Sequence, residues 1–218
     1  MSKKTISPKD GSPDIIVEDD GLTEDLLSSD VTTRVEAVVC SARDWLPKVS
    51  NELKAQTLSD KVKKWAAKYF KTDANNGPDD GELAAIKAVL ANTSNGIGQK
   101  FTINVHVDAA DDAYGYVTHY VSSNGHGHLR DSDDDLIASK GPIHVQHTLF
   151  SPTRNLHLAV ITFIHEATHR YANTFDFDDK GYIDNDGDKF WSAGITKNDA
   201  LLNADSHAWF IYKVISGE

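Results

Sequence analysis

The side chains with the clearest capacity for chemistry are two histidines four residues apart, with a glutamate directly after the first. They are His165, Glu166 and His169, in the run ITFIHEATHRY. On a helix, a spacing of four residues puts two side chains on one face, so both imidazoles can bind the same metal ion. Zinc accepts neutral histidine nitrogens, and a catalytic zinc keeps one coordination position for water. The spacing therefore predicts a zinc site on a helix.

The glutamate between the two histidines suggests what the metal is for. Glu166 is displaced around the helix from His165 and His169, which suits a residue that contacts the metal-bound water rather than the metal. We predict that it is the general base. The alternatives are a buried helix with a coincidental pair of histidines, and a structural zinc. A closed structural site rarely keeps an unused glutamate beside its ligands.

A catalytic zinc site of this kind needs a third protein ligand from outside the helix. Cys40 is the only cysteine, so histidines and carboxylates have to carry the metal. The loop after the helix contains Asp176, Asp178 and Asp179, with Tyr182 beyond them. An aspartate is therefore the expected third ligand.

The helix motif and the aspartates after it resemble the aspzincin metallopeptidases, the family of deuterolysin and peptidyl-lysine endopeptidase. That family continues with Gly-Thr-x-Asp-x-x-Tyr, whereas this chain has NTFDFDDKGY at 173–182. Counting back from Tyr182 selects Asp179 as the ligand, and counting forward from Thr174 selects Asp176. The resemblance favours Asp179, with Asp176 as the alternative. This choice keeps Tyr182 in its family role, as a donor to the oxyanion of the tetrahedral intermediate.

A second segment, Asn203-Ala204-Asp205, is similar to the Asn-Ala-Asp of the family's C-terminal helix. At helical spacing Asp205 falls on an apolar face, where an acid is costly without a partner. The resemblance implies that Asp205 binds substrate at the pocket for the residue after the cut bond, or supports the metal site from behind its ligands. A cap or a core hydrogen bond is the alternative. Lysine-specific members have a second acid one turn later, but Ala208 stands there, so no lysine preference is implied.

The sequence before residue 99 indicates a helical region behind a flexible arm. Residues 1–30 are rich in Asp, Ser, Pro and Gly and are expected to form the arm. Over 31–98, apolar residues recur at helical spacing, which predicts three helices, with breaks at Pro47 and before Asp60. We treat 31–98 as a helical N-terminal part of the molecule.

From residue 99 the pattern becomes that of a small sheet with two later helices. Apolar residues alternate in three short runs, which predicts strands at 101–107, 114–121 and 143–147. The last of these takes the place of the family's edge strand. Ser151 and Pro152 predict the start of the metal helix, and a final helix is expected over 197–215. The fold class is therefore α+β: a helical N-terminal part, a small twisted sheet, and a zincin-like catalytic domain over 99–218.

Two further features are assigned to ordinary structure. His126 and His128 lie in a polar loop rich in aspartate, and a flexible loop is favoured over an accessory metal site. Trp191 and Trp209 are expected in the core rather than at a substrate site.

The composition argues against several classes of function. A formal net charge of -11 disfavours a nucleic-acid partner, which would need clustered Lys and Arg. No apolar run is long enough for a transmembrane helix. The first residues lack the apolar stretch of a secretory signal, so we expect the protein in the cytoplasm of the producing cell, or exported without a cleavable signal.

These motifs predict a zinc-dependent endopeptidase that acts on a protein or peptide. His165, His169 and Asp179 would hold one Zn²⁺, with Glu166 and Tyr182 as catalytic residues. The alternatives are a zinc amidase that acts on cell-wall peptide and a zinc-stabilised binding module that does not use Glu166. A role as a secreted effector or toxin, with an inhibitor or immunity protein as its partner, is a hypothesis without a motif behind it.

Overall fold

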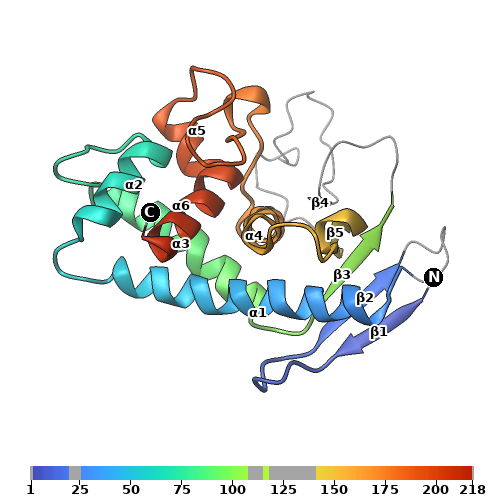
Figure 1. The fold of residues 1–218 in the computed structure, drawn as a ribbon. Helices are drawn as coiled ribbons and strands as arrows, with labels where there is room; N and C mark the ends of the chain where they lie inside the picture. The colour runs from blue at the N-terminus through green and yellow to red at the C-terminus, as the bar shows by residue number, and fades with distance from the viewer. Residues whose placement is uncertain (1, 20–25, 108–114, 118–140, 218) are drawn as a thin grey trace, which may run out of the picture.

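A five-stranded mixed sheet lies beside a group of helices in the computed structural model of the chain (Figure 1). The structure describes residues 2–19, 26–107, 115–117 and 141–217. The strands are β1 (Lys3–Ile6), β2 (Ile15–Asp19), β3 (Phe101–His106), β4 (Gly115–Val117) and β5 (Ile143–Gln146). Their order in the sheet is β1-β2-β3-β5-β4; the three central strands run parallel, and β1 and β4 pair antiparallel at the two edges. The predicted α+β fold class is confirmed.

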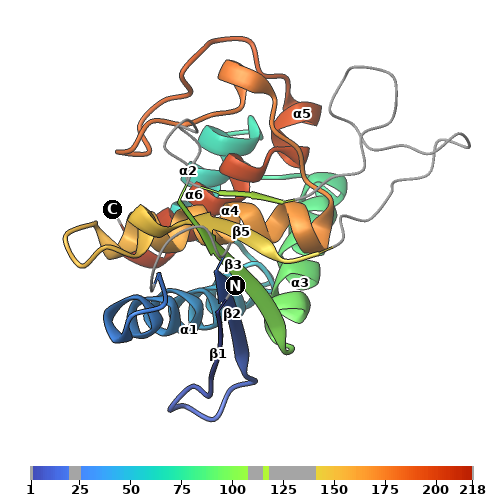
Figure 2. The same cartoon turned by 90° about the vertical axis from the view of Figure 1, so that its right-hand side faces the viewer.

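The helices are arranged around α4, which carries the metal motif. They are α1 (Ser29–Glu52), α2 (Asp60–Phe70), α3 (Asp80–Ile97), η1 (His147–Phe150), α4 (Leu156–Ala172), η2 (Asp178–Lys180), α5 (Lys197–Leu202) and α6 (Ala204–Ser216). α4 contacts α1, α3, α6, β4 and β5. It is seen nearly end-on at the centre of Figure 1 and crosses the middle of Figure 2. Because it is surrounded, α4 is apolar on most of its faces.

The prediction of a flexible arm over residues 1–30 is wrong for the residues that the structure describes. β1 and β2 lie in the sheet, and Ile15 and Val17 of β2 are fully buried. The turn residues that suggested an arm lie between these two strands, which are too short to give a sustained pattern. One cluster of buried apolar side chains extends from Ile15 to Val214, so the boundary at residue 99 does not separate two cores.

Three helix ends differ from the predictions. Pro47 lies inside α1 with its side chain exposed, and the helix continues through it although Pro47 has no backbone N–H to donate. α4 begins at Leu156 rather than at Ser151, because the side chain of Asn155 caps it by accepting from the backbone N–H of His157. The last predicted helix is divided at Asn203, whose backbone is extended, into α5 and α6.

The edge of the sheet beside α4 is formed by β4 and not by the strand expected there. β5, at 143–146, lies between β3 and β4. The predicted strands at 101–107 and 143–147 are present as β3 and β5, and of 114–121 only 115–117 is described. His126 and His128 lie outside the described residues. In the part of the chain that is described, no helix is both long and apolar enough to cross a membrane.

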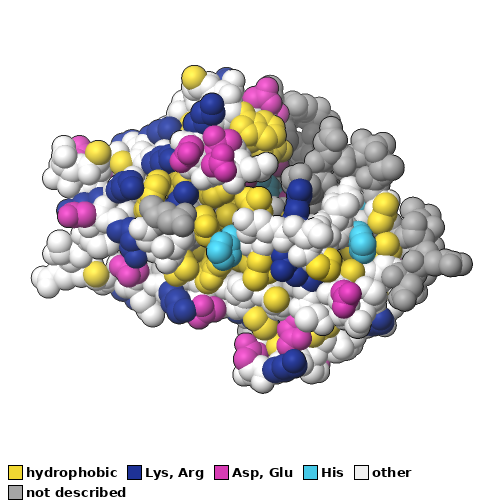
Figure 3. All heavy atoms as spheres, viewed as in Figure 1, with side chains coloured by type: hydrophobic (Ala, Val, Ile, Leu, Met, Phe, Trp, Pro, Cys, Tyr) yellow, Lys and Arg dark blue, Asp and Glu magenta, His cyan; other side chains and the backbone are white. Residues whose placement is uncertain are grey.

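Charge is distributed unevenly over the surface. Although the chain carries a net charge of -11, Lys and Arg side chains gather over α2 on the face shown in Figure 3. α2 contains Lys61, Lys63, Lys64 and Lys68 and a single acid, Asp60. The net charge therefore describes the whole chain and not this surface.

Candidate metal centre

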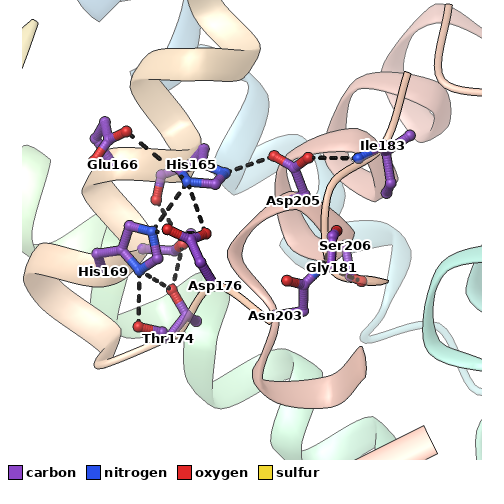
Figure 4. A network of polar contacts seen from close by, with 11 residues as sticks. His165, Glu166, His169, Thr174, Asp176, Gly181, Ile183, Asn203, Asp205 and Ser206 are labelled. Atoms are coloured by element: carbon purple, nitrogen blue, oxygen red, sulfur yellow. Dashed lines mark hydrogen bonds and ion pairs between the residues drawn. The ribbon is translucent and has the colours of Figure 1, made fainter. Parts of the chain in front are cut away.

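Three potential ligand atoms converge at the middle of α4 (Figure 4). The Nε2 atoms of His165 and His169 lie 3.0 Å apart. The Oδ1 atom of Asp176 lies 3.3 Å from the first and 3.4 Å from the second. Ligands bound tetrahedrally to one zinc at about 2.0–2.1 Å are themselves separated by about 3.3 Å. The donor set of two imidazoles and one carboxylate therefore fits a zinc ion, both in chemistry and in spacing.

A turn after α4 brings Asp176 to the histidines. Asn173 ends the helix in the left-handed conformation (φ 53°), which asparagine tolerates better than most residues. The next residue, Thr174, accepts a hydrogen bond from Nδ1 of His169 at its carbonyl, at 2.8 Å. Phe175 then pairs through its backbone with Leu202 and Ala204 at the junction of α5 and α6. These contacts position the residue that follows, Asp176.

Asp179, which the family resemblance favours as the third ligand, lies elsewhere. It is an exposed residue of η2, and its carbonyl accepts from the backbone N–H of Ser192 at 2.9 Å. Asn173 takes the position of the family's glycine. Counting forward from Thr174 then puts Asp176 at the position of the family's aspartate. Tyr182 follows Asp176 by six residues instead of three, and η2 takes up the difference. The structure therefore brings the alternative, Asp176, to the histidine nitrogens.

Glu166 belongs to the same cluster but lies farther from its centre. Its Oε1 atom is 3.8 Å from Nε2 of His165, and the ligand atoms of His165, Glu166 and His169 all lie within 4.8 Å of one another. Its Oε2 atom is buried and has no hydrogen-bond partner among the described residues. Burial raises the pKa of Glu166. A buried carboxylate of raised pKa beside a group of metal-ligating side chains is suited to accept a proton.

Asp205 orients His165. One carboxylate oxygen lies 2.6 Å from Nδ1 of His165, and the other accepts from the backbone N–H of Ile183 at 2.8 Å. This contact leaves Nε2 of His165 directed at the cluster (Figure 4). Since both oxygens are used within the protein, the geometry favours support of the metal site over the expected substrate-binding role.

Tyr182, six residues after Asp176 in the same loop, lies beside the same cluster. It lies close enough to Asp176, Asp205 and Glu166 for their charges to act on its hydroxyl group, and its ring lies 5.2 Å from that of Trp191. Burial, and then the charges of Asp176 and Asp205, raise the pKa of Tyr182. The phenol therefore keeps its proton at neutral pH and is available as a donor.

The charges of the cluster favour a cation. Burial alone would lower the pKa of His165, but the carboxylates of Asp176 and Asp205 raise it well above its usual value. Burial would likewise raise the pKa of Asp176, but the imidazoles of His165 and His169 hold it far below its usual value. With Glu166, three carboxylates surround two imidazoles, so a bound divalent cation would neutralise charge that is otherwise balanced by protons.

Two contributors were not predicted from the sequence. The carbonyl of Thr174 holds His169, and the helix-ending Asn173 before it is the signal that could have indicated this turn. Gly115 of β4 packs on Glu166: a Cβ atom at this position would lie 2.8 Å from Cγ of the glutamate. No local signal marks Gly115, because the contact depends on how β4 lies against α4.

Comparison with known proteins supports the fold. A solved structure of a zinc peptidase from Grifola frondosa is similar, with a TM-score of 0.52 and 13% sequence identity, over 85% of this chain and 96% of that chain. No protein-family model and no curated protein sequence matches this chain. At this level of identity the likeness establishes a shared fold, so the chemistry has to be argued from the residues of this chain.

Proposed function

We propose that this protein is a zinc-dependent endopeptidase of the aspzincin type, which hydrolyses peptide bonds in a protein or peptide substrate. The observation that carries the proposal is the convergence of His165, His169 and Asp176 beside the buried Glu166. The fold shared with a solved zinc peptidase supports it.

The residues of the site have distinct roles in the proposed reaction. His165, His169 and Asp176 would hold the zinc, which when bound acts as a Lewis acid on the peptide carbonyl and makes a water molecule more acidic. Glu166 accepts a proton from the attacking water and passes it to the leaving amine. Tyr182 donates a hydrogen bond to the oxygen on which negative charge develops.

Two contacts keep the ligands in place during the reaction. The carboxylate of Asp205 fixes the ring of His165, and the carbonyl of Thr174 fixes the ring of His169. Each imidazole is thereby oriented before substrate binds, so little reorganisation is needed in the transition state.

The test compares the wild type with Glu166→Gln, measuring zinc content and cleavage of a mixed protein digest by mass spectrometry. The substitution removes the base and leaves the proposed ligands. We expect one zinc in each protein and cleavage by Glu166→Gln slower by about 100-fold or more. Glu52→Gln, which changes an exposed glutamate at the end of α1, serves as the matched control and should cut like the wild type.

Two other outcomes would contradict the proposed peptidase activity. A wild type that binds no zinc contradicts the proposal. If both proteins hold zinc and neither cuts any peptide, the site acts on another amide, such as cell-wall peptide, or it is a structural part of a binding module.

A further inference from the structure

Trp191 lies at the surface, contrary to the expectation that both Trp191 and Trp209 belong to the core. Its side chain is 62% exposed, whereas Trp209 is buried. Among the described residues it is the most exposed of the large apolar side chains. A single exposed tryptophan needs no explanation by itself, so its position and its supports decide whether it has a role.

Trp191 is exposed at the surface and also lies near the group of metal-ligating side chains. Its ring lies 5.2 Å from that of Tyr182, at an angle of 42°. Tyr182 lies close to Asp176, whose carboxylate is 40% exposed and lies beside the histidines. Tyr182 therefore lies between Asp176, at the cluster, and Trp191, at the surface.

The backbone around Trp191 is held by the network that orients the metal ligands. The N–H of Trp191 donates to the carbonyl of Tyr182 at 2.8 Å, and Ile183 pairs with Phe190 in an antiparallel bridge. Ile183 in turn donates to Asp205, which holds His165 (Figure 4). The backbone of the exposed indole is thus fixed relative to the cluster.

The residues that follow Trp191 are small, and the backbone at Gly194 is open to its surroundings. Ser192, Ala193 and Gly194 are small, and a Cβ atom added at Gly194 would meet no atom within 4 Å. An exposed aromatic side chain offers contact area at low entropic cost, as aromatic residues do in other recognition surfaces.

We propose that Trp191 is a substrate-binding residue whose indole binds a large apolar or aromatic side chain of the peptide close to the bond that is cut. This inference rests on the proposed function and adds the chemical class of side chain that the site selects. An indole is flat and largely apolar, so it gains most from covering another apolar surface.

The test measures binding separately from cleavage. The zinc-loaded Glu166→Gln protein is labelled with ¹⁵N, and the indole signal of Trp191 is assigned from its absence in Trp191→Phe. The probes are decapeptides of Ala and Gly with one Phe at each position in turn, and an otherwise identical peptide without Phe. We expect one or two of the Phe peptides to shift the Trp191 signal, and to bind about tenfold more weakly when Trp191→Ala is added.

The control variant is Leu202→Ala, which removes another exposed apolar side chain, on α5, and keeps the backbone hydrogen bond from Phe175 to Leu202. It should leave the affinity for the Phe peptides unchanged. The peptide without Phe should bind alike to the proteins with and without Trp191. In the wild type, cut sites should be enriched in large apolar residues at one position, and Trp191→Ala should lose that enrichment.

Three results would overturn the inference: a Trp191 signal that no Phe peptide shifts, equal affinity of Trp191→Ala for all peptides, or a signal that shifts with protein concentration alone. The last would mean that the indole is an interface between two copies of the chain. Phe peptides that bind at Trp191 but are never cut by the wild type would support this inference and contradict the proposed function.

Discussion

The two histidines of the cluster are held by partners of different kind. His165 is bonded to the carboxylate of Asp205, and His169 to the backbone carbonyl of Thr174. A carboxylate partner makes an imidazole a stronger metal ligand than a carbonyl does, so the two nitrogens should differ in their affinity for a metal. His165 is the ligand whose strength depends on a side chain and is therefore open to change by substitution.

The identity of the third ligand can be tested with two neighbouring aspartates. Loss of a partner behind a ligand costs about 10–100-fold in metal affinity, so loss of a ligand should cost at least about 100-fold. We expect Asp176→Asn to lose zinc affinity by that amount and Asp179→Asn to keep it, measured by competition with a chromophoric chelator. If Asp179→Asn loses zinc affinity and Asp176→Asn keeps it, the third ligand is Asp179, as the spacing from Tyr182 predicts.

His207 should make the stability of the protein depend on pH. It is fully buried against Phe70, and its Nε2 lies 2.8 Å from the carbonyl of Leu201. Burial lowers the pKa of His207 to about 4, below the ordinary value of 6.5 that it regains on unfolding. The neutral form stabilises the fold fully above pH 6.5, and this stability is lost as the pH falls to about 4, by about 3 kcal/mol in all.

Urea unfolding at pH 7, 5.5 and 4 measures this effect. Other groups also titrate over this range, so the informative quantity is the difference between the wild type and His207→Gln, whose amide can still donate to Leu201. The variant should lose less stability on acidification than the wild type. Parallel curves for the two proteins would show that His207 does not titrate as its burial implies.

At the scale of elements, the sequence best predicts those helices and strands that are marked by a regular spacing of apolar residues. The spacing of His165 and His169 and the apolar residues around them predict α4 because both are properties of one helix. The choice between Asp176 and Asp179 depends on a three-residue turn, η2, that no periodic pattern marks. The role of Asp205 depends on α6 packing against α4, and β2 depends on pairing with a strand far along the chain. The sequence could therefore name the helix motif but not the contacts between elements.

β4 places a constraint on the proposed base. An alanine at Gly115 would bring its methyl group to 2.8 Å from Cγ and 3.0 Å from Oε1 of Glu166, so the glutamate or the strand would have to move. A displacement of about 1 Å at a catalytic group can cost about 100-fold in rate. We expect Gly115→Ala to keep its zinc and to cut peptides about 10–100-fold more slowly, measured as kcat/KM.

The matched control for this substitution is Gly81→Ala. Gly81 lies in the first turn of α3, where a Cβ atom would make only an ordinary contact at 3.4 Å. Its activity should equal that of the wild type. Unchanged activity in Gly115→Ala would mean that Glu166 has more freedom than its packing against β4 suggests.

At the scale of the whole molecule, the first strands are as much a part of the core as the metal helix. Val17 of β2 is fully buried, while its neighbour Glu18 pairs with Lys3 at the surface. If residues 1–30 were a free arm, neither position would matter for stability. Val17→Ala should lower the free energy of unfolding by about 2 kcal/mol or more, and Glu18→Gln should change it by less than about 0.5 kcal/mol.

Urea unfolding of the zinc-free proteins, with a chelator present, measures both changes without the contribution of metal binding. Equal and small effects at the two positions would mean that β2 is not part of the cooperative fold.

The parallel pairing of β2 with β3 also has a consequence for how the molecule forms. Ile15 lies opposite Phe101, and the whole of α1, α2 and α3 stands between them in the chain. Pairs so far apart close slowly, because much chain entropy is lost before the contact forms, and a β1–β2 hairpin alone is marginally stable in water. During synthesis, β2 can therefore pair in the sheet only after β3 has been made. Asp205 follows β3, β5 and α4 in the chain, so the group of metal-ligating side chains can be completed only after all of these elements have been made.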